Sequence, residues 1–134
     1  MKKLLFYIGI LTLVITLSKC KLDGGGYEKS DVVLNLTSWI LPDTAKVLVP
    51  FNTSLTSLLD NSCLKNLRFE VDKYDNVTYR VYARAVYENH GEACYDMQEY
   101  KDSTISVTIE NPGKYYFYFL REGKFRKDSI VIKP

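Results

Sequence analysis

The chain has 134 residues and a formal net charge of +2, from 18 Lys and Arg and 16 Asp and Glu. This length allows one compact domain behind a short leader. The near-balance of charge excludes a strongly basic domain, so we expect no nucleic acid among the partners.

The first residues have the layout of an export signal. Two lysines precede an apolar run over residues 4–17. This run is shorter than the roughly 20 apolar residues that a membrane-spanning helix needs. We therefore expect a processed leader rather than a transmembrane segment.

The apolar run ends at Leu17-Ser18-Lys19-Cys20, which resembles the lipobox of Gram-negative bacterial lipoproteins. The resemblance implies that residues 1–19 are removed and that Cys20 carries lipid. It implies a membrane partner through this anchor, in the bacterial cell envelope. It favours the outer membrane, with the periplasmic and surface sides both open.

Residues 20–30 are expected to form a flexible tether. They include three consecutive glycines and several charged residues, which give the segment little to bury. Removal of residues 1–19 would remove Lys2, Lys3 and Lys19, so the net charge would fall from +2 to about −1 in the mature chain.

From Asp31 onward, apolar and polar residues alternate with a period of two, which predicts β-strands. The expected strands cover residues 32–37, 46–51, 67–72, 77–86, 94–100, 104–109, 115–120 and 125–133. The leucines of residues 55–64 are spaced nearer three and four, which leaves a bent strand and helical turns both open. Seven or eight short strands predict a single antiparallel β-sandwich, and a closed barrel has the same pattern.

Pro112-Gly113-Lys114-Tyr115 resembles the Pro-Gly-x-Tyr start of a late strand in bacterial immunoglobulin-like domains. The resemblance implies an Ig-like sandwich over residues 31–134, with the tyrosine at the corner between the two sheets. It also suggests a small envelope lipoprotein. The fold that it implies does not by itself define a function.

Cys63 and Cys94 remain as an even pair once Cys20 is assigned to lipid. In an exported, oxidising compartment such a pair favours a disulfide. The alternatives are two free thiols or a metal site, although zinc would need further ligands nearby.

We expect no catalytic residues, no metal and no cofactor. His90 is the only histidine, so a triad or a histidine-based metal site lacks partners. The turn that contains Asp72, Asp75 and Asn76 offers fewer oxygen ligands than calcium takes.

Tyrosine is unusually frequent, with 11 in the chain. Strand alternation places Arg80, Tyr82 and Arg84 on one face of their strand, and Tyr116 and Tyr118 on one face of theirs. If Tyr116 and Tyr118 lie near Tyr82, these residues form an exposed binding patch, since Tyr and Arg dominate binding hot spots. The alternative is that tyrosine is simply a good strand former.

Three tripeptides, Asp43-Thr44-Ala45, Asp102-Ser103-Thr104 and Asp128-Ser129-Ile130, resemble acceptors of periplasmic O-glycosylation in some Gram-negative bacteria. The resemblance implies modification at Thr44, Ser103 and Ser129.

These observations predict a non-enzymatic envelope lipoprotein that binds a protein or glycan or serves as an accessory subunit. The alternative is an inhibitor of a secreted hydrolase, such as a lysozyme or protease, that inserts the loop Asn89–Ala93 into its target. An enzyme is disfavoured because no nucleophile–base pair can be assembled.

Overall fold

The computed structural model describes residues 26–134, and these residues form strands and turns without a helix. The expected signal peptide over residues 1–19, the expected lipidation site Cys20 and residues 20–25 of the expected tether lie outside the described residues. The strands are β1 Glu28–Leu34, β2 Leu36–Ile40, β3 Thr44–Lys46, β4 Phe51–Asn61, β5 Leu64–Lys73, β6 Thr78–Asn89, β7 Asp96–Val107, β8 Gly113–Arg121 and β9 Lys124–Lys133.

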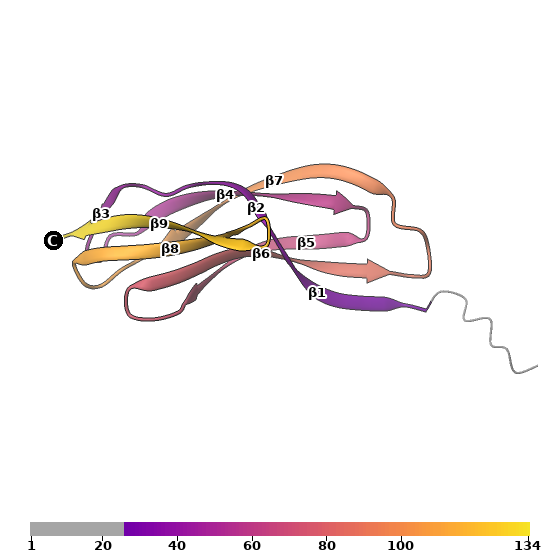
Figure 1. The fold of residues 1–134 in the computed structure, drawn as a ribbon, viewed down its shortest axis with the longest axis horizontal. Coiled ribbons are helices and arrows are strands. Elements are labelled where there is room, and N and C mark those ends of the chain that lie inside the picture. The colour runs from indigo at the N-terminus through magenta and orange to yellow at the C-terminus, as the bar shows by residue number, and fades with distance from the viewer. Residues whose placement is uncertain (1–25) are drawn as a thin grey trace, which may run out of the picture.

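The strands form two sheets, which confirms the predicted all-β sandwich (Figure 1). The smaller sheet has the order β2-β4-β7 and is antiparallel. The six-stranded sheet is built around β6. One edge of β6 pairs with β5, and its other edge pairs first with β8 and then with β1.

The six-stranded sheet is mixed, whereas the sequence predicted antiparallel pairing alone. β6 and β8 are parallel, and so are β3 and β9. The cause lies in the chain path, because β7 crosses to the smaller sheet and the chain then returns as β8 in the direction of β6. Residues 26–134 form nine strands. The expected first strand divides at Asn35 and changes sheet there, the ambiguous stretch over residues 55–64 belongs mainly to β4, and the strands expected over residues 94–100 and 104–109 are one strand, β7. The strand expected over residues 46–51 is wrong, because residues 47–50 form the turn between β3 and β4, where Leu48 has a φ of 61°.

The core between the sheets consists of inward positions from both of them. Phe117 and Phe119 of β8 are fully buried. Phe117 stacks on Tyr79 with ring centroids 5.0 Å apart, and Phe119 stacks on Trp39 at 4.6 Å. Because Trp39 belongs to β2, this aromatic stack joins the two sheets.

Two local features match the turns expected from the sequence. Glu122 and Gly123 both have positive φ, at 51° and 70°, as a tight two-residue hairpin between β8 and β9 requires. Tyr115 is buried at the start of β8, and its hydroxyl donates to the carbonyl oxygen of Asn111 at 3.1 Å. This hydrogen bond back to the preceding loop has the geometry of a tyrosine corner.

The predicted Cys63–Cys94 disulfide is present and links the β4–β5 turn to the segment before β7. It lies at the end of the sandwich where β1 begins, while the C-terminus lies at the other end (Figure 1). The disulfide therefore ties the two sheets together at the end of the domain where β1 begins.

Candidate functional site

The outward face of the six-stranded sheet carries the five residues of the predicted binding patch. The parallel pairing of β6 and β8 places Arg80 opposite Tyr118, and Thr78 opposite Tyr116. Tyr82 and Arg84 lie further along β6, beyond its contact with β8. The structure thus brings Arg80, Tyr116 and Tyr118 together, whereas Tyr82 and Arg84 make a different set of contacts.

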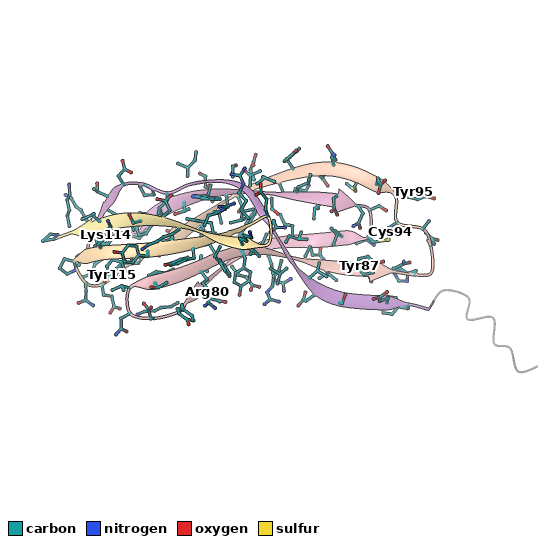
Figure 2. The ribbon with its side chains drawn as sticks, viewed as in Figure 1. Arg80, Tyr87, Cys94, Tyr95, Lys114 and Tyr115 are labelled. Carbon is teal, nitrogen blue, oxygen red and sulfur yellow. A yellow bond between two sulfur atoms is a disulfide. The ribbon has the colours of Figure 1, made fainter. Side chains whose placement is uncertain are left out.

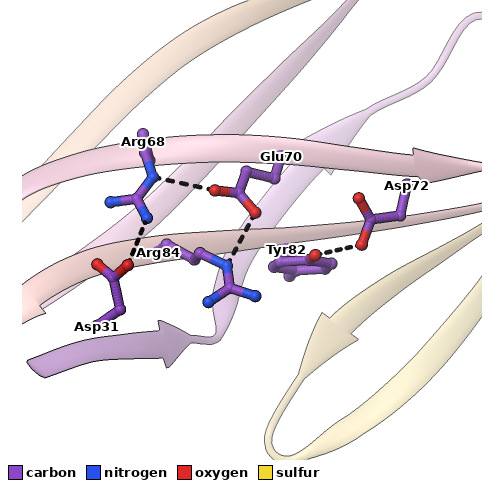
Figure 3. A network of polar contacts seen from close by, with 6 residues as sticks. All are labelled: Asp31, Arg68, Glu70, Asp72, Tyr82 and Arg84. Carbon is purple, nitrogen blue, oxygen red and sulfur yellow. Dashed lines mark hydrogen bonds and ion pairs between the residues drawn. The ribbon is translucent and has the colours of Figure 1, made fainter.

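That second set is a network of polar groups on β1, β5 and β6, which we call the polar network (Figure 3). Its members are Asp31, Arg68, Glu70, Asp72, Tyr82 and Arg84. The Arg68 guanidinium bridges Asp31 at 3.1 Å and Glu70 at 3.0 Å, and Arg84 donates to Glu70 at 2.8 Å.

Tyr82 completes the polar network by donating its hydroxyl to Asp72. This bond to a carboxylate raises the pKa of Tyr82, and the hydrogen bond with Glu70 raises the pKa of Arg68. Both arginines of this network are therefore paired within the domain, and its three carboxylates against two guanidinium groups leave it with one net negative charge. A partner that approached here would have to break existing ion pairs.

The neighbouring region has a different composition, and we call it the aromatic–basic patch. Its members are Tyr74, Arg80, Lys114, Tyr116, Tyr118, Phe125 and Lys127. They come from the β5–β6 turn, β6, β8 and β9. The cations of this patch lie against aromatic rings: the Lys127 ammonium is 3.8 Å from the centroid of the Tyr116 ring, and that of Lys114 is 5.8 Å away.

No carboxylate within residues 26–134 forms an ion pair with Arg80, Lys114 or Lys127. This contrasts with Arg68 and Arg84 on the same face of the same sheet. A cation held over a ring keeps its charge and most of its N–H donors available. The patch is therefore equipped to bind an anionic group.

A hollow of about 680 Å³ lies at the open side of the sandwich, between β5 and β7. Its walls carry charges of both signs, including Lys65, Arg68, Glu99, Lys101 and Asp102. Arg68 is part of the polar network, and Lys101 pairs with Glu99. All three cations of this hollow form ion pairs with carboxylates, and Phe69 is the one aromatic side chain in its lining.

The suspected inhibitory loop Asn89–Ala93 connects β6 to the segment before β7. The Asn89 side-chain oxygen accepts the backbone N–H groups of Gly91 at 2.8 Å and Glu92 at 3.0 Å, which fixes the loop. The Nε2 atom of His90 lies 3.5 Å from Glu88 Oε1, and the His90 ring lies against that of Tyr27 at a tilt of 43°, with centroids 4.8 Å apart.

Tyr95 follows this loop and exposes 73% of its surface, although its backbone is fixed by two hydrogen bonds to Ser62. Figure 2 shows Tyr87, Cys94 and Tyr95 together at the disulfide end. Arg80 and Lys114 lie toward the other end of the domain (Figure 2).

Glu88 lies beside the start of β1, where it pairs in register with Lys29. The Tyr27 hydroxyl donates to it at 3.2 Å, and this bond, aided by nearby Lys29, Lys65 and His90, lowers the pKa of Glu88. A lowered carboxyl pKa contributes stability that is fully present above the pKa of the unfolded chain and is lost as the pH falls through the lowered value.

Tyr27→Phe should therefore raise the pKa of Glu88 toward that of an ordinary glutamate, because its main hydrogen-bond donor is lost. It should also weaken the acid dependence of stability. NMR titration of the Glu88 side chain checks the prediction, with Tyr100→Phe on the opposite sheet as the control. An unchanged Glu88 titration in Tyr27→Phe would contradict it.

The three glycosylation candidates differ in accessibility. Thr44 is exposed at the start of β3, and Ser103 is exposed on the edge strand β7. Ser129 is half-buried in β9, between β8 and β3. Modification at all three positions stays a prediction, and Ser103 is the most open of them to an enzyme that binds extended chain.

Comparison of the chain with protein-family models, with curated proteins and with solved structures gives no match in any of the three. Within residues 26–134, no helix is long and apolar enough to span a membrane. The same part of the chain has no cluster of three or more His, Cys, Asp or Glu side chains that could hold a metal ion.

Proposed function

We propose that the protein is a non-enzymatic lipoprotein of the bacterial cell envelope, whose β-sandwich binds a protein or glycan through the aromatic–basic patch. The observation that supports this most is the contrast on one sheet face. Both arginines of the polar network form ion pairs, whereas Arg80, Lys114 and Lys127 rest on rings and form no ion pair with a carboxylate of residues 26–134. Aromatic rings and arginine are also the groups that dominate binding hot spots.

The membrane anchor in this proposal is lipid on Cys20. Cys20→Ala should prevent lipid attachment, so the protein should move from the membrane pellet to the soluble fraction, or remain as the unprocessed precursor. Cell fractionation with metabolic labelling by a fatty-acid analogue measures both effects. Retention of the label in Cys20→Ala would disprove lipidation at this residue.

Site-specific photocrosslinking in cells tests the binding surface. A benzophenone amino acid in place of Phe125, which is 45% exposed within the patch, should give a discrete crosslinked product. The same substitution at Tyr100, an exposed aromatic residue on β7 of the other sheet, serves as the matched control and should not. Equal crosslinking at both positions, or none at Phe125, would contradict the proposed surface.

A second candidate function is inhibition of a secreted hydrolase by the loop Asn89–Ala93. Its support is the fixed conformation of this loop and the exposed ring of Tyr95 beside it. Assays of the purified protein against lysozymes and secreted proteases test it, since Tyr95→Ala should relieve any inhibition. Absence of inhibition across these enzymes would leave the aromatic–basic patch as the binding surface.

A further inference from the structure

A hollow of about 330 Å³ lies within the aromatic–basic patch, near the β5–β6 turn. Its walls are formed by Tyr74, Asp75, Thr78, Arg80, Tyr118 and Phe125. Three aromatic side chains thus surround a single cation. The volume is at the small end of the range of ligand pockets, about 300–1,000 Å³, and suits one compact ring rather than an extended chain.

The guanidinium of Arg80 lies against aromatic rings in this pocket. The guanidinium carbon lies 3.7 Å from the centroid of the Tyr74 ring and 5.5 Å from that of Phe125. Stacking of this kind orients the guanidinium and leaves the N–H groups on its edge free to form two parallel bonds to a carboxylate.

Two acidic residues near Arg80 accept hydrogen bonds from other groups. Asp72 is its neighbour in register on β5 and accepts the hydroxyl of Tyr82. Asp75 lines the pocket and accepts the backbone N–H of Val77 at 2.8 Å; this bond lowers the pKa of Asp75, so its carboxylate stays ionised and adds one negative charge to the pocket wall. Neither carboxylate forms an ion pair with Arg80, so the guanidinium has aromatic support and no ion-pair partner within residues 26–134.

We propose that this pocket binds an acidic sugar, with the sugar carboxylate on the edge of Arg80 and the sugar ring against the aromatic side chains. The proposal rests on the binding function proposed above and names the chemical class of its ligand. Sugar rings present C–H faces that pack on aromatic rings, and their hydroxyls match the hydroxyls of Thr78 and Tyr118.

The surroundings of the pocket favour an acidic polymer over a single acidic side chain of a peptide. Lys127 lies opposite Tyr118 in register, and Lys114 shares the Tyr116 ring with it. These two ammonium groups extend the positive surface along β8 and β9, where further acidic units of a glycan can lie. An aspartate or glutamate side chain would use Arg80 but leave the aromatic walls largely uncovered.

The test is NMR titration of the full mature protein in detergent micelles with four probes: trigalacturonate, sialyllactose, neutral lactose and a triglutamate peptide. The acidic sugars should shift signals of Arg80, Tyr118 and Phe125 and bind at least tenfold more tightly than lactose. Arg80→Gln should weaken this binding tenfold or more, because a charge-assisted pair is lost. Tyr74→Ala, at an exposed turn residue, should also weaken it.

Arg84→Gln is the matched control, since Arg84 lies on the same face of β6 but is paired with Glu70. It should leave the affinity unchanged, and thermal unfolding should confirm that all three variants are folded. The proposal is overturned if neither acidic sugar binds better than lactose at millimolar concentration, if Arg80→Gln and Tyr74→Ala both bind as the wild type does, or if triglutamate alone binds.

Photocrosslinking at Phe125 distinguishes a wrong ligand class from a wrong binding surface. A crosslink in cells without any affinity for acidic sugars would overturn the ligand class and leave the binding surface in place. Loss of both would remove the proposed function together with the ligand.

Discussion

Phe117→Ala should lower the free energy of unfolding by about 3–5 kcal/mol, the usual effect of removing a large buried aromatic side chain. Phe117 is fully buried, and its ring contacts both sheets. It stacks on Tyr79 of β6 at 5.0 Å and meets the edge of Phe51 of β4 at 6.2 Å. No neighbouring strand can collapse into the resulting space without disturbing its pairing in a sheet.

Urea unfolding of the purified protein measures this effect. Phe125→Ala is the control, because Phe125 lies on the outward face of the same sheet and is 45% exposed. Its loss of stability should be at most about 1 kcal/mol. Similar losses in the two variants would mean that the sandwich does not pack around Phe117.

Replacing both Cys63 and Cys94 with alanine should cost about 3–4 kcal/mol, as the chain-entropy model gives for a loop of this length. The two cysteines are 31 residues apart in the sequence, and the loop they close contains β5 and β6. Without the disulfide, the β4–β5 turn and the start of β7 are joined at this end mainly by two hydrogen bonds between Ser62 and Tyr95 and by pairing of Asn61 with Asp96. In one of the two bonds the Ser62 N–H donates to the Tyr95 carbonyl oxygen, and in the other the Tyr95 N–H donates to the Ser62 hydroxyl oxygen.

Chemical reduction of the wild-type protein should reproduce the urea midpoint of the double variant. Hydrogen exchange should show the largest loss of protection near Ser62 and Tyr95. A decrease below about 1 kcal/mol would contradict the expected role of the disulfide.

The strands that the sequence predicts correctly are those in which apolar and polar residues alternate regularly. β6 and β8 bury every second residue, and their apolar positions follow the same period. The stretch over residues 55–64 was ambiguous because Ser57 takes an inward position of β4 and Leu58 an outward one, and β4 also has Thr53 at an inward position. Both hydroxyl residues are fully buried: Ser57 donates to the carbonyl oxygen of Asn35 at 2.8 Å, while the Thr53 hydroxyl has no hydrogen-bond partner.

The candidate site was predicted only in part. The face of a strand on which a side chain lies follows from the neighbouring residues, whereas the pairing of strands depends on the path of the whole chain. Alternation correctly grouped Arg80 with Tyr82 and Arg84, and Tyr116 with Tyr118, on one face of each strand, and the structure shows that these faces point away from the core. Alternation gave no indication that β6 and β8 are parallel, since this depends on the excursion of β7. Tyr74, Phe125 and Lys127 were missed for the same reason, as they join the patch only through the turn and the β8–β9 register.

The position of β1 determines how mechanical force would pass through the domain. β1 runs antiparallel to β6 over seven residue pairs, and Arg80 lies further along β6 itself. A pull between a membrane anchor and a partner held at Arg80 would therefore travel through these two strands. Since the pull acts along the strand axis, it would load their hydrogen bonds together in shear instead of breaking them one after another. The rest of the sandwich would carry little of the tension.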